Sequence, residues 1–116
     1  MRVLMVGFNS YQELDIAINK LMEESQCFLF TVVCGGMDIL PFRDKGEYVS
    51  LAHEWAEKNG APINWCCNYY TIDEMIKDLH RNTDYLLIKI DENTPQIWKN
   101  FMMAHKAEGK HGRVIR

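Results

Sequence analysis

The sequence predicts an α/β fold, a single Rossmann-like domain over residues 1–116. Its five-stranded parallel sheet has the order 3-2-1-4-5, with helices on both faces. Apolar periodicity alternates between strand and helix along the whole chain, with no repeat and no linker. The segment Cys27–Cys34 is apolar at both odd and even positions, which is typical of a strand buried on both faces of a parallel sheet. At 116 residues the chain is long enough for one core and short for two.

The first half of the chain starts with a strand at Arg2–Gly7. Ser10 and Glu13 have the spacing of a capping box, so a helix begins there. Cys27–Cys34 is the second strand. The apolar face of the first helix comprises Leu14, Ala17, Ile18 and Leu21.

A second helix is predicted over Glu47–Asn59, and Gly60 with Pro62 ends it. The third strand follows at Ile63–Cys67. The apolar residues of this helix are Tyr48, Leu51, Ala52 and Trp55.

Thr71 and Glu74 form a second capping box, and the fourth strand is Tyr85–Ile90. Thr94 is the expected N-cap of the last helix, with Pro95 at its first position. The third helix carries its apolar residues at Ile72, Met75, Ile76 and Leu79. The last helix turns Ile97, Phe101 and Ala104 inward and ends at Gly109, and a short strand follows at Arg113–Ile115.

The composition is that of a globular protein, with 47% hydrophobic and 25% charged residues. No apolar run approaches the roughly 20 residues that span a bilayer, so no membrane association is expected. The first ten residues lack a signal-peptide pattern, which predicts a cytoplasmic protein. The net charge of −3 makes nucleic-acid binding an unfavoured function.

The charge is uneven, because residues 99–116 contain five Lys or Arg and the single acid Glu108. This basic end is typical of a solvated helix C-terminus, and contact with a phosphate or a partner is the alternative. His105 and His111 belong to it, whereas His53 and His80 are expected at the surface. No His or Cys spacing indicates a metal site or a catalytic triad, and the four cysteines are expected as reduced thiols.

Ligands of such sheets bind outside the carboxyl ends of the strands, where the strand order reverses. Here that point lies between the first and fourth strands. Four loops should open on this edge: Gly7–Ser10, Cys34–Asp38, Asn68–Tyr70 and Asp91–Thr94. Each precedes a helix N-terminus, which favours anions.

Gly35 and Gly36 let the backbone approach a phosphate or sugar, or serve a tight turn. The long loop behind them carries Asp38, Arg43, Asp44 and Lys45 as polar groups. Its apolar residues Met37, Ile39, Leu40 and Phe42 indicate a flap, a dimer contact or packing below the sheet. Thr94 could hold a phosphate or act only as a cap, and Asp91–Asn93 could bind ribose hydroxyls. The aromatic side chains available for stacking on a base are Phe8, Tyr69, Tyr70 and Trp98.

Two common nucleotide motifs are absent. The sequence has no Gly-x-x-x-x-Gly-Lys-Ser/Thr loop, which excludes P-loop hydrolysis, and no Gly-x-Gly-x-x-Gly, which disfavours a nicotinamide dehydrogenase. No cofactor is therefore expected.

With these segments placed, the chain resembles the SLOG superfamily of Rossmann-like domains, in particular its small stand-alone YspA/YpsA-related branch. The resemblance covers nearly the whole chain and rests on MRVLMVGFNSY, VVCGGMD, GEYVSLAHEWAEKNGAPI and NTDYLLIKID. It implies a nucleotide-derived ligand, a homodimer formed through helices, and a bacterial or viral defence setting. Trp98, Met102 and Met103 are the residues expected at that dimer interface.

The chain departs from this branch at its polar positions. Asn9 stands where the branch usually has Arg, and Glu47 follows an insertion that replaces a Gly-Ala-Asp tripeptide. Thr94 lacks the usual preceding glycine. The fold elements therefore persist while the polar set differs, which favours binding over catalysis.

The sequence thus predicts a protein that binds a nucleotide-derived or ADP-ribose-like molecule as a sensor or sequestering protein. An N-glycosidic hydrolase is the alternative, with Asp38, Asp44 or Glu47 as its carboxylate. A protein-interaction module is the third. The predicted ligand-binding residues are Gly7, Phe8, Asn9, Ser10, Gly35, Gly36, Met37, Asp38, Arg43, Glu47, Tyr69, Asp91, Asn93 and Thr94.

Overall fold

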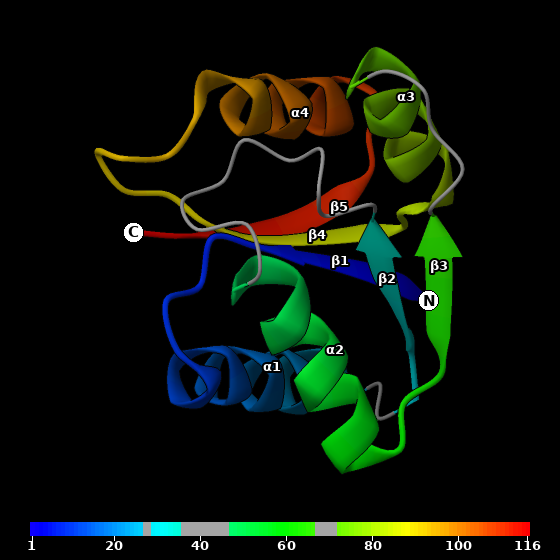
Figure 1. Cartoon of the computed structure of the whole chain (residues 1–116), viewed down its shortest axis with the longest axis vertical. Coiled ribbons are helices and arrows are strands. Elements are labelled where there is room, and N and C mark those ends of the chain that lie inside the picture. Colours follow the sequence, from blue (N-terminus) through cyan, green and yellow to red (C-terminus); the bar gives the residue numbers. More distant parts are fainter. Residues whose placement is uncertain (27–28, 36–46, 67–71) are drawn as a thin grey trace.

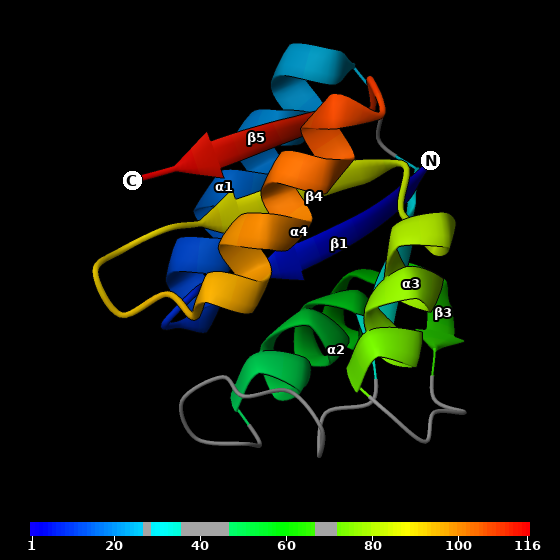
Figure 2. The same cartoon turned by 90° about the horizontal axis from the view of Figure 1, so that it is seen from above.

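The computed structural model of the chain describes residues 1–26, 29–35, 47–66 and 72–116. It contains a five-stranded, all-parallel sheet in the order β3-β2-β1-β4-β5, which confirms the predicted fold class and strand order (Figures 1 and 2). The strands are β1 (Arg2–Val6), β2 (Thr31–Gly35), β3 (Ile63–Cys66), β4 (Tyr85–Lys89) and β5 (His111–Ile115).

Four helices cover the two faces of the sheet, with α1 and α2 on one face and α3 and α4 on the other (Figure 1). Alternation along the strands gives each face its own core. On β1, Val3 and Met5 belong to the α1–α2 core, and Leu4 and Val6 to the α3–α4 core. The helices are α1 (Tyr11–Ser25), α2 (Glu47–Asn59), α3 (Ile72–Asn82) and α4 (Gln96–Ala107).

The second strand begins later than the sequence predicts. β2 starts at Thr31 and not at Cys27, which lies outside the described residues. Leu29 is 87% exposed, and Phe30 turns inward to stack on Trp55 at 5.5 Å between ring centroids. The apolar run is therefore partly a connection that docks one aromatic ring against α2. At the other end of the sheet, β5 begins two residues before the predicted Arg113.

The inward face of α4 also differs from the prediction. Trp98, Phe101 and His105 are its buried residues, whereas Ala104 is exposed and Ile97 only partly buried. Both sets include Phe101 and both fit helical spacing. The structure selects the set with the larger rings, which fill more of the space above β4. Trp98 is therefore a core residue and not the exposed interface residue that the sequence suggested.

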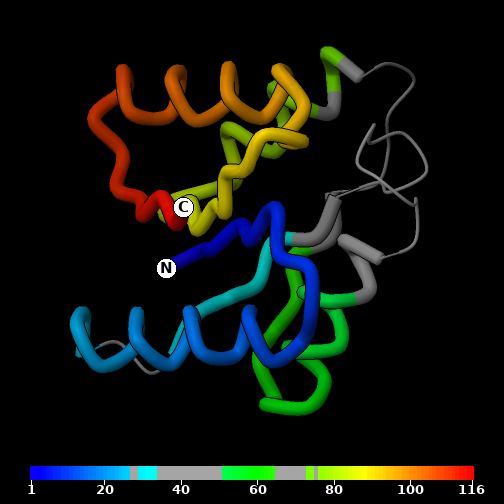
Figure 3. Tube along the Cα trace, turned by 90° about the vertical axis from the view of Figure 1, so that its left-hand side faces the viewer, coloured from blue at the N-terminus to red at the C-terminus, as the bar shows by residue number. Residues whose placement is uncertain are grey.

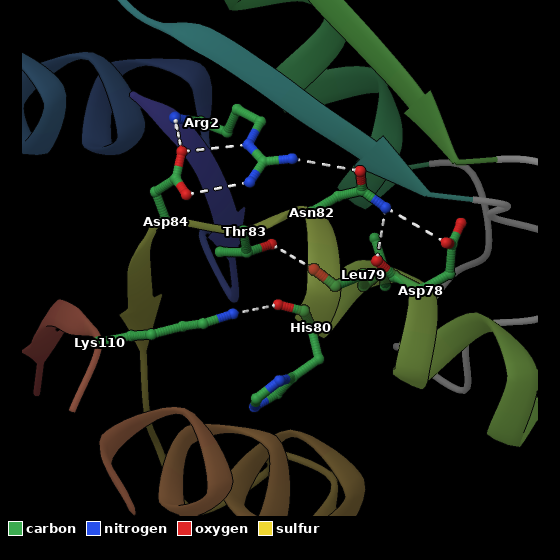
Figure 4. Close-up of polar contacts among 8 residues, drawn as sticks. All are labelled: Arg2, Asp78, Leu79, His80, Asn82, Thr83, Asp84 and Lys110. Carbon is green, nitrogen blue, oxygen red and sulfur yellow. Dashed lines mark hydrogen bonds and ion pairs between the residues drawn. The ribbon is translucent and has the colours of Figure 1, made fainter. Parts of the chain in front are cut away.

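Arg2 closes the amino-terminal edge of the sheet by reaching a segment 82 positions away (Figure 4). Its guanidinium donates to both carboxylate oxygens of Asp84 at 3.1 Å, and its backbone N–H donates to the same carboxylate at 2.9 Å. The same guanidinium donates to Asn82 at 3.3 Å, and Asn82 donates to the backbone of Asp78 at 2.8 Å. The start of β1 is thus tied to the end of α3.

Two further hydrogen bonds complete this edge (Figure 4). The buried Thr83 hydroxyl donates to the carbonyl of Leu79 at 2.6 Å. Lys110 Nζ, just before β5, donates to the carbonyl of His80 at 2.6 Å. The carboxyl end of α3 therefore has its free carbonyls satisfied by side chains from two segments.

No helix in the described part of the chain combines the length and apolarity needed to cross a membrane.

Candidate functional site

The candidate site is the carboxyl edge of the sheet, where β1 and β4 lie side by side in the middle of the strand order. The helix after β1 turns to one face and the helix after β4 turns to the other. Figure 3 shows α1 and α4 on opposite sides of the strands. Two helix N-termini therefore flank this point from opposite faces, which is the geometry of a switch-point ligand site.

Gly7 directly follows β1 at this point and has a left-handed conformation, with φ of +95°. A Cβ at this position would lie 2.2 Å from the carbonyl oxygen of Lys89 at the end of β4. The glycine therefore serves close contact between two strand ends. Its role at this edge is structural, and it fixes the direction in which the next three residues leave the sheet.

Phe8 does not have the role that the sequence suggested. Its side chain is 3% exposed and packs in the α1–α2 core, so it offers no open face for stacking on a base. Trp98, at 1% exposed, is excluded from stacking for the same reason.

Asn9 and Ser10 are exposed at the N-terminus of α1. The Ser10 hydroxyl accepts a hydrogen bond from the N–H of Glu13 at 3.2 Å, which confirms Ser10 as the N-cap. The Glu13 carboxylate reaches the neighbouring strand, where Glu13 Oε1 lies 2.7 Å from Lys89 Nζ. Both side chains are largely buried, so this ion pair places opposite charges at the switch point itself.

The loop between β4 and α4 forms a turn stabilised by its own side chains. The Thr94 hydroxyl accepts from the N–H of Asp91 at 2.8 Å and donates to the Asp91 carboxylate at 3.3 Å. The same carboxylate accepts from the N–H of Asn93 at 2.8 Å. Asn93 and Glu92 remain exposed, whereas Thr94 is buried.

This loop corrects the prediction for Thr94. The N-cap of α4 is Pro95, which makes no side-chain capping bond, and the Thr94 hydroxyl is already used within the turn. Thr94 therefore shapes the loop and does not cap the helix. The expectation that its hydroxyl holds a phosphate loses its geometric basis.

Several predicted residues lie outside what the structure describes. Gly35 ends β2 at the same edge, and Glu47 begins α2, although the side chain of Glu47 is not described. The remaining ones lie outside the described residues: Gly36, Met37, Asp38, Arg43, Asp44 and Tyr69.

The sequence reasoning missed Lys89. It stands as the one charged residue in YLLIKI, between two apolar neighbours at the carboxyl end of a central strand. A lysine at the end of this strand could have been identified as a candidate ligand-binding residue, because strand ends at the switch point face the ligand.

It also missed a histidine cluster between α3 and α4. His80, expected at the surface, has a side chain only 14% exposed and packs edge-on against Phe101 at 5.3 Å. His105 is 2% exposed, and its Nε2 lies 2.6 Å from the carbonyl oxygen of His111, so that nitrogen donates. Burial lowers the pKa of His105, which keeps the ring neutral.

A cavity of about 660 Å³ lies between α3 and α4. Ile76 and Phe101 give it an apolar lining, and Lys77 and Arg81 add positive charge. Its lining also includes Asp73 and Ile97, which come from the first turns of the two helices, so the cavity extends to the carboxyl edge. Within the described part of the chain, no group of His, Cys, Asp and Glu side chains is arranged to hold a metal ion.

No protein-family model matches the chain, and no curated protein is significantly similar to it.

Proposed function

We propose that this protein binds a small nucleotide-derived or ADP-ribose-like molecule at the carboxyl edge of the sheet, as a sensor or a sequestering protein. The observation that carries the proposal is the reversal of strand order between β1 and β4. Because of this reversal, α1 and α4 lie on opposite faces of the sheet. Their N-termini both lie at the carboxyl ends of the neighbouring strands β1 and β4. Helix N-termini in this arrangement attract phosphate groups.

The charges of the described residues support an anionic ligand. Lys89 is a largely buried cation one strand away from the N-terminus of α1, and Glu13 neutralises it at 2.7 Å. An incoming phosphate would share the Lys89 ammonium with Glu13 and meet the exposed Asn9 and Ser10 beside it. Asn93, exposed on the loop after β4, would contact the sugar.

Membership of the SLOG superfamily is part of the same proposal, since its ligands are nucleotide-derived. The homodimer belongs here too, with the 61% exposed Met103 on the outer face of α4 as its central contact. Trp98 is removed from that interface because it is buried. A hydrolase remains the second candidate, and it would depend on Asp38, Asp44 or Glu47.

The proposal is tested with purified protein and a panel of AMP, cyclic AMP, NAD and ADP-ribose, by thermal shift and then by calorimetry. A ligand at about 100 times its Kd adds roughly 2.7 kcal/mol of stability, which raises Tm by several degrees. Lys89→Met keeps the aliphatic stem and removes the charge, so it should weaken binding about tenfold or more. The matched control is Lys20→Met, because Lys20 is an exposed lysine on α1 that lies away from the edge.

Two outcomes would contradict the proposal. If no compound of the panel shifts Tm, the proposal of a nucleotide-derived ligand is wrong. If the Lys89→Met and Lys20→Met proteins bind equally well, the proposed location of the site at the switch point is wrong. Chromatography of the ligand after incubation separates binding from cleavage: an intact ligand supports a sensor, and a released base supports the hydrolase.

A further inference from the structure

β5 is an edge strand of five residues, and the backbone groups of two of them face away from the sheet. The carbonyl of Ile115 accepts from the N–H of Ile90 at 2.8 Å, so Ile115 points toward β4. In a parallel strand the N–H and C=O of one residue point to the same side, and successive residues alternate. Gly112 and Val114 therefore direct their N–H and C=O groups outward, where an additional strand would pair.

A groove of about 380 Å³ lies on the α4 side of this edge. Its lining is apolar at Met102 and Val114, and Lys106 and Arg116 give it positive charge. Lys110 and Arg113 also line it, but they form ion pairs with Glu108 and Glu24. No Asp or Glu side chain is among the described residues that line it. The positive charge is local, since residues 1–98 contain eight Lys or Arg against fifteen Asp or Glu.

A second groove, of about 270 Å³, lies on the α1 side of the same strand. Its lining is apolar at Phe8, Ala17 and Ile115, and the charged residues Glu13, Lys20 and Arg113 also contribute to it. Ile16 also lines it and is 69% exposed, a large apolar side chain left uncovered beside the edge. The two faces of β5 thus offer grooves of different chemistry.

We propose that β5 binds an extended acidic peptide segment of a partner protein, which adds to the sheet as a sixth strand. Side chains of an added strand alternate between the faces, so one set would enter the basic groove and the other the apolar groove. The partner segment therefore alternates Asp or Glu with Val, Ile or Leu. Its backbone pairs with the outward groups of Gly112 and Val114.

The charge at this edge disfavours a second copy of the chain as the occupant. Symmetric pairing of two β5 strands would be antiparallel and would bring the two basic grooves together. Arg113 adds little net charge there, because it forms an ion pair with Glu24 of its own copy. Lys106 and Arg116 of both copies would then crowd the same region. Like charges placed opposite one another destabilise a strand pair, whereas an acidic strand neutralises them.

The probe is a fluorescent peptide of about ten residues that alternates Glu with Val, measured by anisotropy against the full chain. A control peptide has the same composition with its Glu and Val residues segregated. The expected result is binding of the alternating peptide, with an affinity that falls as salt is raised because the basic groove contributes. Absence of binding at about 1 mM peptide, or equal binding of the segregated peptide, would overturn the proposal.

Two substitutions separate the backbone from the charge. Val114→Pro deletes an outward N–H and leaves the bonds to β4, and should weaken the peptide about tenfold; Val114→Thr keeps the N–H and should bind normally. Lys106→Glu should weaken the peptide about three- to tenfold and flatten its salt dependence, whereas Lys99→Glu, on the same helix outside the groove, should not. Because Lys106 is exposed, this pair tests the proposal even where Val114→Pro fails to fold.

Other occupants give distinct results. Tighter binding of an oligouridylate than of the peptide, lost in Lys106→Glu and kept in Val114→Pro, would replace the proposal with a nucleic-acid groove. Displacement of the peptide by unlabelled protein, with a mass that doubles over the same concentration range, would replace it with a dimer.

Discussion

The two ends of the sheet are built differently. At the amino-terminal edge, side chains join segments distant in sequence, as Arg2 with Asp84 and Lys110 with His80 (Figure 4). At the carboxyl edge, Ser10 with Glu13 and Asp91 with Asn93 and Thr94 form hydrogen bonds within their own loops. An ion pair between Glu13 and Lys89 joins α1 to β4 there.

This difference indicates that the two edges of the sheet have different roles, one in stability and the other in ligand binding. Long-range bonds at one edge hold β1, α3 and β4 in register, so they contribute to stability. The local bonds at the other edge shape its loops, and that edge also carries the exposed side chains Ser10 and Asn93. Changes at the amino-terminal edge should therefore alter unfolding, and changes at the carboxyl edge should alter binding as well.

Gly7→Ala should have the largest effect on stability, because it disrupts the close contact between Gly7 and the backbone of Lys89. The new Cβ would lie 2.2 Å from a backbone oxygen, and φ of +95° is already unfavourable for alanine. We expect a loss of about 3 kcal/mol or more in the free energy of unfolding, measured with urea. The control is Gly60→Ala, where φ is +66° and no atom lies within 4 Å, with an expected loss of about 1 kcal/mol. Equal losses would mean that the strand ends do not depend on this contact.

A pair of buried threonines, one at each edge, tests the comparison directly. Thr83→Val removes a bond to Leu79, and Thr94→Val removes the acceptor for the N–H of Asp91. Each should lower the free energy of unfolding by about 1 to 2 kcal/mol, since a buried polar group loses its partner. Only Thr94→Val should also weaken the nucleotide ligand, as measured by calorimetry. A similar loss of affinity in Thr83→Val would show that the two edges are not separate in function.

Arg2→Met should have a smaller effect, about 1 kcal/mol at pH 7, because the pair it forms with Asp84 is partly exposed and screened by water. The hydrogen bonds from Arg2 hold the pKa of Asp84 below its usual value. A carboxyl group with a lowered folded-state pKa adds stability above its unfolded pKa, near 4, and loses it as pH falls through the folded value. The wild-type protein should thus lose more stability than Arg2→Met between pH 5 and pH 2. Parallel urea-unfolding curves for the two proteins over that range would refute this assignment.

The smallest expected effect is a pH dependence that originates at His105. Burial is the main cause of its lowered pKa; Lys110 and His80 lower it further, while the bond to His111 and the charge of Glu108 raise it. The unfolded chain therefore takes up this proton more readily than the folded one. Stability should fall as pH drops below the unfolded pKa near 6.5, toward the lower folded value. His105→Gln should reduce this fall when the urea unfolding of the two proteins is compared across this pH range.

The architecture could be predicted from the sequence because each element carries its own periodic signal and capping residues. The bounds of α2 agree with the prediction at both ends, since Asn59 and Gly60 stop it. The start of β2 could not be read in this way. Leu29 and Phe30 are both apolar, so the sequence does not show which of them is buried. The position of Trp55 on α2 decides it, because Phe30 stacks on that ring.

The edge that carries the candidate site was predictable, but the state of its residues was not. Thr94 has the sequence signature of an N-cap, yet its hydroxyl accepts a hydrogen bond from the backbone N–H of Asp91 and does not cap the helix. Phe8 follows a strand end and yet packs inward. Both outcomes depend on contacts between neighbours in a loop, for which the sequence provides residue types without geometry. Lys89 was overlooked because an isolated charge in an apolar strand has no motif.

The central position of β1 in the sheet has a consequence for the nascent chain during translation. β1 pairs with β4, and the paired residues Val3 and Tyr85 are 82 positions apart. A ribosome adds roughly 5 to 20 residues per second, so one side of this apolar strand waits about 4 to 16 s for its partner to be synthesised. During that time Val3–Val6 is an uncovered hydrophobic segment of the kind that chaperones bind. The nascent chain should therefore need such protection until β4 has left the exit tunnel, and slower translation should lengthen that need.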